Sequence, residues 1–347
     1  MHLPIVIDPI DYRWELLKNI LNTFDLRKTK MVIASYIPIK KVIPMLKVVT
    51  TSMFFSTTIT HVLEELRVRK DLRNFLGVKE CEVPRKSYLY SFLSKFSLNS
   101  FLSMVSRILN SITKRRARNT RIIVDCTDVS VDINYFRKPV RQRDLEGKEY
   151  RWGYSTKGKF IGMKLTLVME YPSLKPLLFL IHPANKHEAR IYPEIMDELR
   201  RRRISRKGDT ILMDKGFYAY KNYLIGLNEY RLVPVIFPRS NFNQSRLDGL
   251  LSYPLDIFEK NLEKEKVRIK KIRDKLMAML SNWKRLKGIR SVIEDVFKLS
   301  KSMGLKGIHR YTKRSVHKYA AMNVLLVGII ASLGFKEKKV IQRLAES

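Results

Sequence analysis

The first third of the chain carries apolar residues at helical spacing. One stripe follows the i, i+3, i+4, i+7 spacing of an α-helix and consists of Leu89, Phe92, Leu93 and Phe96. A second stripe runs from Leu98 to Ile112, and Ser97 or Asn99 is the candidate residue to cap it. Because such stripes usually face a core, the pattern predicts an α-helical N-terminal domain over residues 1–118.

From residue 120 the apolar positions change to the pattern of strands. Five short apolar runs, bounded by turn residues, predict strands at 121–126, 160–169, 176–181, 210–214 and 232–237. Between and after them, helical spacing predicts helices at 187–203, at 218–227 and around Glu294. The order βββαβαβα indicates an α/β domain over residues 119–336, with a mixed sheet flanked by helices.

Three further segments stand apart from this order. Residues 239–284 separate the fifth strand from the last helix and are predicted to be an insertion. Its later part, 259–275, alternates acids and bases at helical spacing, which favours a solvent-exposed helix. The apolar segment 320–335 contains Asn323 and is short for a membrane span, so we expect a buried terminal helix and no membrane partner. A basic tail, 337–347, follows.

The charge of the chain indicates a polyanionic partner. Lys and Arg number 68 against 33 Asp and Glu, which gives a formal net charge of +35 over 347 residues. A thermophile-like surface rich in cations would normally carry nearly matching acids. We therefore expect salt-sensitive binding to nucleic acid. The basic run 114–118 is either a solvated helix end or a phosphate contact.

Cysteine usage and the N-terminus point to a reducing compartment. Cys81 and Cys126 are the only cysteines, too few for a disulfide framework or a cysteine-based zinc site. The first residues include an early proline and an acid and do not match a secretory signal. We expect a cytoplasmic, nucleoid-associated protein.

Three acids have the surroundings that a metal site needs. Asp125 and Asp214 each close an apolar strand run, where a carboxylate requires a compensating charge, and Glu294 lies in the run Arg290-x3-Glu294-x6-Lys301. On a helix this run places an acid between two cations on one face. Carboxylate oxygens suit Mg²⁺ or Mn²⁺, and two such ions are a common solution to phosphodiester cleavage. Asp128 and Asp132 compete for the role of Asp125, but they follow Thr127 and are expected beyond the strand.

These residues resemble the DDE transposases of bacterial and archaeal insertion sequences, whose catalytic domain has an RNase H-like fold. The resemblance covers residues 120–335. The family's Asp-x-Thr and Asp-Lys-Gly-Tyr elements are similar to Val124-Asp125-Cys126-Thr127 and to Asp214-Lys215-Gly216-Phe217-Tyr218. Its Tyr-x2-Arg-x3-Glu-x6-Lys signature is matched at Arg290, Glu294 and Lys301, with Lys287 in place of the tyrosine. The segment from Trp152 to Lys164 resembles the family's entry into the second strand.

The resemblance implies a function and a set of site residues. Asp125, Asp214 and Glu294 would hold two Mg²⁺ or Mn²⁺ ions, and Arg290 and Lys301 would bind phosphates beside the cut. Further candidate DNA contacts are Lys287, Lys164, Trp152 and Lys215. The protein would cut DNA with water and use the freed 3′-OH to attack target DNA. Its partners would be double-stranded DNA, both element ends and target, and a second copy in a homodimer on DNA.

Two alternative functions remain open on the sequence. One is an RNase H-like nuclease or resolvase that uses water alone. The other is a catalytically retired transposase kept as a DNA-binding protein, against which the three intact acids argue. The interleaved aromatic and basic residues of 150–159 suit base stacking or a core equally well. For His187 we expect a helix cap, and for Trp283 packing under the insertion.

Overall fold

The predicted N-terminal helices are present in the computed structural model. It describes residues 12–112, 121–131, 150–155, 158–256, 263–306, 308, 313–335 and 344–345. By their internal contacts these residues form two units, one from the described parts of Met1–Arg115, Asp128–Met163 and Asp295–Ser347, the other from those of Arg116–Thr127 and Lys164–Glu294. The domain boundaries expected at 118 and 336 fall outside the described residues and stay predictions.

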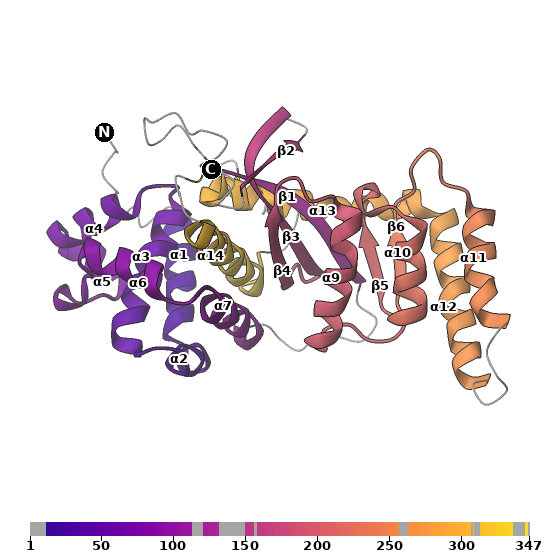
Figure 1. The fold of residues 1–347 in the computed structure, drawn as a ribbon. Coiled ribbons are helices and arrows are strands. Elements are labelled where there is room, and N and C mark those ends of the chain that lie inside the picture. The colour runs from indigo at the N-terminus through magenta and orange to yellow at the C-terminus, as the bar shows by residue number, and fades with distance from the viewer. Residues whose placement is uncertain are drawn as a thin grey trace. The chain divides into compact units, whose positions relative to one another are not determined.

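Helices dominate the first unit (Figure 1). They are α1 (Tyr12–Asn22), α2 (Arg27–Ala34), α3 (Ile39–Phe54), α4 (Ile59–Val68), α5 (Lys70–Leu76), α6 (Lys86–Lys95), α7 (Leu98–Ile112) and α14 (Lys313–Ser332). The C-terminal helix α14 packs against α7, α3, α1 and α6. Ser97 caps α7, because its Oγ accepts a hydrogen bond from the backbone N–H of Ser100 at 3.1 Å.

The terminal apolar helix is buried, as expected from its length and composition. Within the described residues Arg314–Ser332 is long and apolar enough to cross a membrane, but 83% of this window is buried inside the structure. The segments Val42–Phe54 and Ile59–Val68 pass the same test only as a pair bent by 115°. Asn323 lies in the middle of α14 and donates hydrogen bonds to the carbonyls of Ser300 and Met303. The polar residue in the apolar run therefore ties α14 to the segment that precedes it.

Six strands form the sheet. They are β1 (Arg121–Ser130), β2 (Arg151–Ser155), β3 (Gly158–Tyr171), β4 (Pro176–Pro183), β5 (Thr210–Met213) and β6 (Val233–Ile236). Their order is β2-β3-β1-β5-β6, and β4 also pairs with β3. β1, β5 and β6 are parallel, whereas β2 is antiparallel to the start of β3. The predicted mixed sheet is therefore confirmed, with β2 as a strand that the apolar pattern did not predict.

The core of the second unit joins the parallel strands to its helices. These are α9 (Glu188–Arg201), α10 (Tyr220–Leu224), α11 (Gln244–Asp256), α12 (Glu263–Ser281) and the first part of α13 (Lys287–Ser300). Side chains of β1, β5, β6, α9, α11 and α12 share one apolar cluster. The helix predicted at 218–227 is shorter, because α10 ends at Leu224 and a π-helical turn follows at Ile225–Glu229.

The helix of the insertion is exposed over most of the described part of 259–275, as expected, but it also has a buried stripe. Helix α12 places Ile269 and Ile272, and further along Leu276 and Leu280, in the same core as the sheet. Its dense charges hid an apolar stripe at helical spacing. Asp128 lies within β1 and not beyond the strand, because β1 extends to Ser130 through residues that alternate in burial. Asp132 falls outside the described residues.

Candidate active site

Strand register brings the two aspartates together. β1 and β5 pair in parallel, with Val124 opposite Met213. The residues that follow these two are Asp125 and Asp214, which therefore lie at the same end of adjacent strands. Parallel neighbours lie about 4.8 Å apart, so side chains at matching positions are close. Asp125 is still within β1, whereas Asp214 is the first residue after β5.

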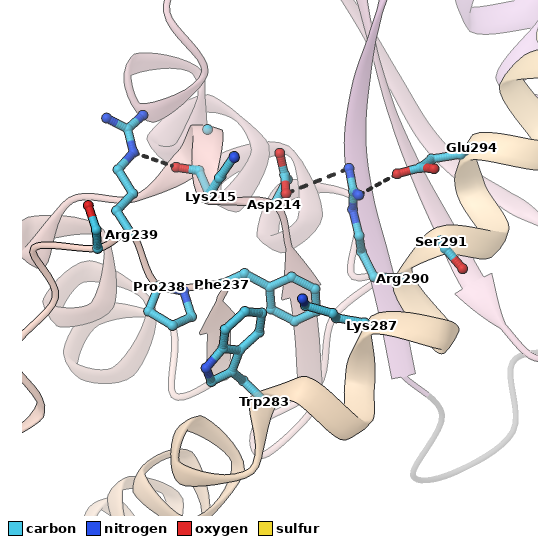
Figure 2. Close-up of a pocket in the computed structure, with 12 residues that line it drawn as sticks. Asp214, Lys215, Phe237, Pro238, Arg239, Trp283, Lys287, Arg290, Ser291 and Glu294 are labelled. Carbon is cyan, nitrogen blue, oxygen red and sulfur yellow. Dashed lines mark hydrogen bonds and ion pairs between the residues drawn. The ribbon is translucent and has the colours of Figure 1, made fainter.

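Helix α13 adds a third carboxylate and a cation. Nη2 of Arg290 lies 2.6 Å from Oδ2 of Asp125 and 3.7 Å from Oδ1 of Asp214. Nη1 of the same arginine lies 2.5 Å from Oε1 of Glu294, one helical turn later. Figure 2 shows the guanidinium between Asp214 and Glu294. The structure thus brings the three acids predicted from the sequence around a single guanidinium.

Burial makes this cluster electrostatically costly. Asp125 is 6% exposed, and desolvation raises its pKa to about 7, although Arg290 and the backbone N–H of Cys126 act in the opposite direction. The carboxylates of Asp214 and Glu188 raise the Asp125 pKa further. The pKa of Arg290 is raised by its three carboxylate neighbours in spite of burial. One cation therefore serves three acids, and the site is short of positive charge.

The donor set fits a hard divalent cation. Carboxylate oxygens are the ligands that Mg²⁺ and Mn²⁺ prefer. Within the described part of the chain, however, no three His, Cys, Asp or Glu side chains are arranged as a metal-ion cluster. The Arg290 guanidinium lies among the acids, and its buried Nε has no hydrogen-bond partner. The residues suit a metal ion if the arginine side chain moves away from the carboxylates.

Two of the three acids, Asp214 and Glu294, line a pocket with a basic and aromatic wall. The pocket has a volume of about 880 Å³, and Asp214, Glu294, Phe237, Trp283 and Lys287 are among the residues that line it (Figure 2). The Lys287 ammonium lies 4.7 Å from the centroid of the Trp283 ring, which itself packs 5.4 Å from the Phe237 ring. Trp283 is therefore both packed against the core, as expected, and part of the pocket wall.

The other residues predicted to contact DNA lie in different surroundings. Lys215 is exposed and lines the same pocket as Lys287. Lys164 is paired with Glu188 at 3.2 Å. Lys301 follows α13 in a π-helical turn and is paired with Asp128 at 2.6 Å. Together with Trp152, which is 47% exposed, Lys301 belongs to the first unit.

Polar residues at both ends of α9 take part in local structure. His187 is the N-cap of α9, because its Nδ1 accepts a hydrogen bond from the backbone N–H of Ala189, so the expected cap is confirmed. In the basic run at the end of α9, Arg201 and Arg202 both pair with Glu198 of the same helix.

Glu188, which directly follows the His187 cap, is a functional candidate beyond the three predicted acids. It is the first residue of α9, its charge acts on Asp125, and it is held by Lys164. A side chain at Gly216 would place its Cβ 1.6 Å from Oε2 of Glu188, so a larger residue at 216 would displace the glutamate. Glu188 directly follows a recognisable helix cap, which was the available signal. Arg239 was missed, and its Nε donates to the Lys215 carbonyl at 3.0 Å.

Comparison with protein families decides which kind of site this is. A family described as the transposase DDE domain matches residues 116–328, more than half of the chain. The chain belongs to this transposase family. A search of curated proteins found no significant match.

Membership confirms the resemblance found in the sequence. The matched residues include all three acids of the cluster, and the transposase domain together with the observed sheet confirms the RNase H-like fold. Transposases of this family act on DNA, recombine it and generally use divalent metal ions. The Tyr-Arg-Glu-Lys subgroup stays a prediction, because Lys287 replaces the tyrosine.

Proposed function

We propose that this transposase cuts DNA strands at the ends of an insertion sequence and joins the freed 3′-OH to target DNA. The observation that carries the proposal is the convergence of Asp125, Asp214 and Glu294 on one guanidinium. These acids come from a strand, a strand end and a helix. Their burial with a single cation leaves negative charge that divalent ions would neutralise.

In the proposed reaction the three acids would hold two Mg²⁺ or Mn²⁺ ions. Bound there, the ions would supply Lewis-acid activation of the attacking oxygen and charge stabilisation for the leaving one. The chain's own cations position the substrate. Arg290, once released from the acids, is placed to bind a phosphate beside the cut, and Lys287 and Lys215 line the pocket into which the backbone would pass.

The proposed partner is double-stranded DNA, both element ends and target. A net charge of +35 favours a phosphate polymer over any neutral or basic partner. We also propose that two copies act together on paired ends, as the family resemblance implies, and that the protein works in the cytoplasm.

Isosteric substitution of each acid tests the proposal. We expect Asp125→Asn, Asp214→Asn and Glu294→Gln each to reduce strand cleavage and strand transfer by roughly a thousandfold or more, because each removes a metal ligand. DNA affinity should change by less than about threefold. The exposed Glu64→Gln serves as a control and should keep full activity. Full activity in any of the three variants would remove that residue from the site.

The substrate separates the proposed reaction from its alternatives. A duplex with a pre-cut 3′-OH end, supplied with a target plasmid and Mg²⁺ or Mn²⁺, should be joined to the target. Cleavage without joining would indicate a nuclease or resolvase. DNA binding without either reaction, with and without metal, would indicate a retired enzyme.

A further inference from the structure

The first unit presents a β-hairpin with two aromatic side chains on one face. β2 pairs antiparallel with the start of β3, with Trp152 opposite Ile161 and Tyr154 opposite Lys159. Side chains alternate along a strand, and directly opposite residues share a face. The rings of Trp152 and Tyr154 therefore lie on the same face as the Lys159 ammonium, which is 5.8 Å from the centroid of the Tyr154 ring.

Both rings are held out to solvent on an anchored backbone. Trp152 is 47% and Tyr154 77% exposed, which makes Tyr154 the most exposed aromatic residue of the described chain. The hairpin beneath them is fixed, since Tyr150 is buried and Gly162 packs directly against the Val129 carbonyl. Two exposed rings on a fixed backbone are suited to contact a flat ligand without losing much conformational entropy.

The exposed rings are suited to one form of nucleic acid. In a duplex both faces of each base are covered by the neighbouring bases of its strand, so a protein ring has no free face to stack on. Exposed rings can stack on bases that have been unpaired and drawn apart.

We propose that Trp152, Tyr154 and Lys159 form a stacking platform for unpaired bases of single-stranded DNA. The inference rests on the proposed function in taking DNA as the partner, and adds that part of the substrate is bound unpaired. Aromatic rings stack on bases of any sequence, and a neighbouring cation binds the adjacent phosphate. A second copy of the chain is disfavoured as the occupant, because two chains of charge +35 repel each other.

Binding without metal tests the platform apart from catalysis. The full-length protein in EDTA is titrated into a fluorescein-labelled single strand and into a duplex of the same length. We expect Trp152→Leu combined with Tyr154→Leu to bind the single strand at least about tenfold more weakly, with less than about a threefold change for the duplex. Trp152→Phe combined with Tyr154→Phe keeps both rings and should stay within about threefold of wild type. Tyr88→Leu removes an aromatic residue of similar exposure, 46%, from a helix and should have no effect.

Two further readouts report on stacking itself. Single-stranded DNA should quench tryptophan fluorescence in the wild type, and this quenching should be reduced in Trp152→Phe. Lys159→Gln should reduce the slope of log affinity against log salt concentration for the single strand by the amount of about one phosphate contact.

Three outcomes would overturn the proposal. The leucine variant could bind the single strand like wild type, or lose duplex and single strand equally. It could also convert a wild-type dimer to a monomer, seen by sedimentation without DNA, with single-strand affinity unchanged. None of these results depends on strand transfer, so failure of the platform and failure of the proposed reaction are distinguishable.

Discussion

Arg290 is the residue on which the state of the active site depends. Among the described residues it is the one cation that pairs with all of Asp125, Asp214 and Glu294. Leaving three clustered acids without a counter-ion would cost several kcal/mol. The same guanidinium lies among the oxygens that a metal ion would use. Arginine and metal are therefore expected to compete for the acids.

Removing this arginine should strengthen metal binding by the free protein. For Arg290→Ala we predict Mn²⁺ affinity on the order of tenfold higher at pH 7.5, because the competing cation is gone. The metal-free variant should be less stable by about 3 kcal/mol. Electron paramagnetic resonance of free Mn²⁺ and thermal melts in EDTA measure the two effects. Lys287 lines the same pocket without pairing to the acids. Its substitution Lys287→Ala should leave both the Mn²⁺ affinity and the melting temperature unchanged. Equal or weaker Mn²⁺ binding in Arg290→Ala would contradict competition.

His182 gives the stability a dependence on pH. It is 7% exposed, and burial lowers its pKa from 6.5 to about 4; Lys186 and Lys164 lower it further, and the Glu194 carboxylate at 3.6 Å does not offset them. Below pH 6.5 His182 is protonated in the unfolded chain but stays neutral in the folded chain. Its contribution to the free energy of unfolding is therefore complete above pH 6.5 and is lost as the pH falls from 6.5 to 4.

The size of this effect is measurable against a variant that cannot titrate. His182 should account for about 2 kcal/mol of stability lost between pH 8 and pH 5. In His182→Leu this part of the loss should vanish, as measured by urea unfolding at the two pH values. An unchanged difference between pH 8 and pH 5 would show that His182 titrates normally in the folded protein.

At the scale of elements, the contact of β3 with β1 depends on a glycine. Gly162 has φ of +154°, and a Cβ there would lie 2.1 Å from the Val129 carbonyl oxygen. Backbone cannot move aside as a flexible side chain does. The hairpin of β2 and β3 and the end of β1 are therefore locked together by the absence of a side chain.

Gly162→Ala should destabilise the protein by about 2–4 kcal/mol, through steric overlap and backbone strain. The matched control is Gly249→Ala, in helix α11, where a Cβ would meet no atom within 4 Å. That change should be neutral or stabilising by up to about 1 kcal/mol, because alanine favours the helix. Thermal unfolding of both variants measures the contrast. Equal melting temperatures would show that β1 and β3 adjust to the added methyl group.

The elements differ in how far their patterns predicted them. Strands β5 and β6 and the first part of β1 are mainly apolar runs, because both of their faces are buried. β2 was missed since the polar residues of Arg151–Ser155 alternate with exposed aromatics and one buried glycine. In α12 the charges are frequent enough to hide the buried stripe. A polar composition therefore hid the buried face of both elements, β2 and α12, because that face is narrow in each.

At the scale of the whole molecule, charge dominates the interaction with DNA. The net charge of +35 is spread over the chain, so binding should release many counter-ions. We predict that affinity for duplex DNA falls by about 10³-fold or more between 50 and 200 mM salt, as for six or more phosphate contacts. Fluorescence anisotropy at a series of salt concentrations gives the slope. A slope near zero would mean that phosphates contribute little.

The sequence by itself determined five of the six strands and the helices between them, the two aspartates at strand runs, and the Arg290–Glu294 pair on a helix, because periodicity and side-chain chemistry are local properties. The tertiary structure alone decided that Asp125 and Asp214 are neighbours, through the register of β1 with β5. It also decided that Arg290 reaches both aspartates, that Glu188 acts on Asp125, and that Trp152 and Tyr154 are exposed. These facts depend on pairing and packing between residues distant in the chain, and local periodicity carries no information on which distant residues meet.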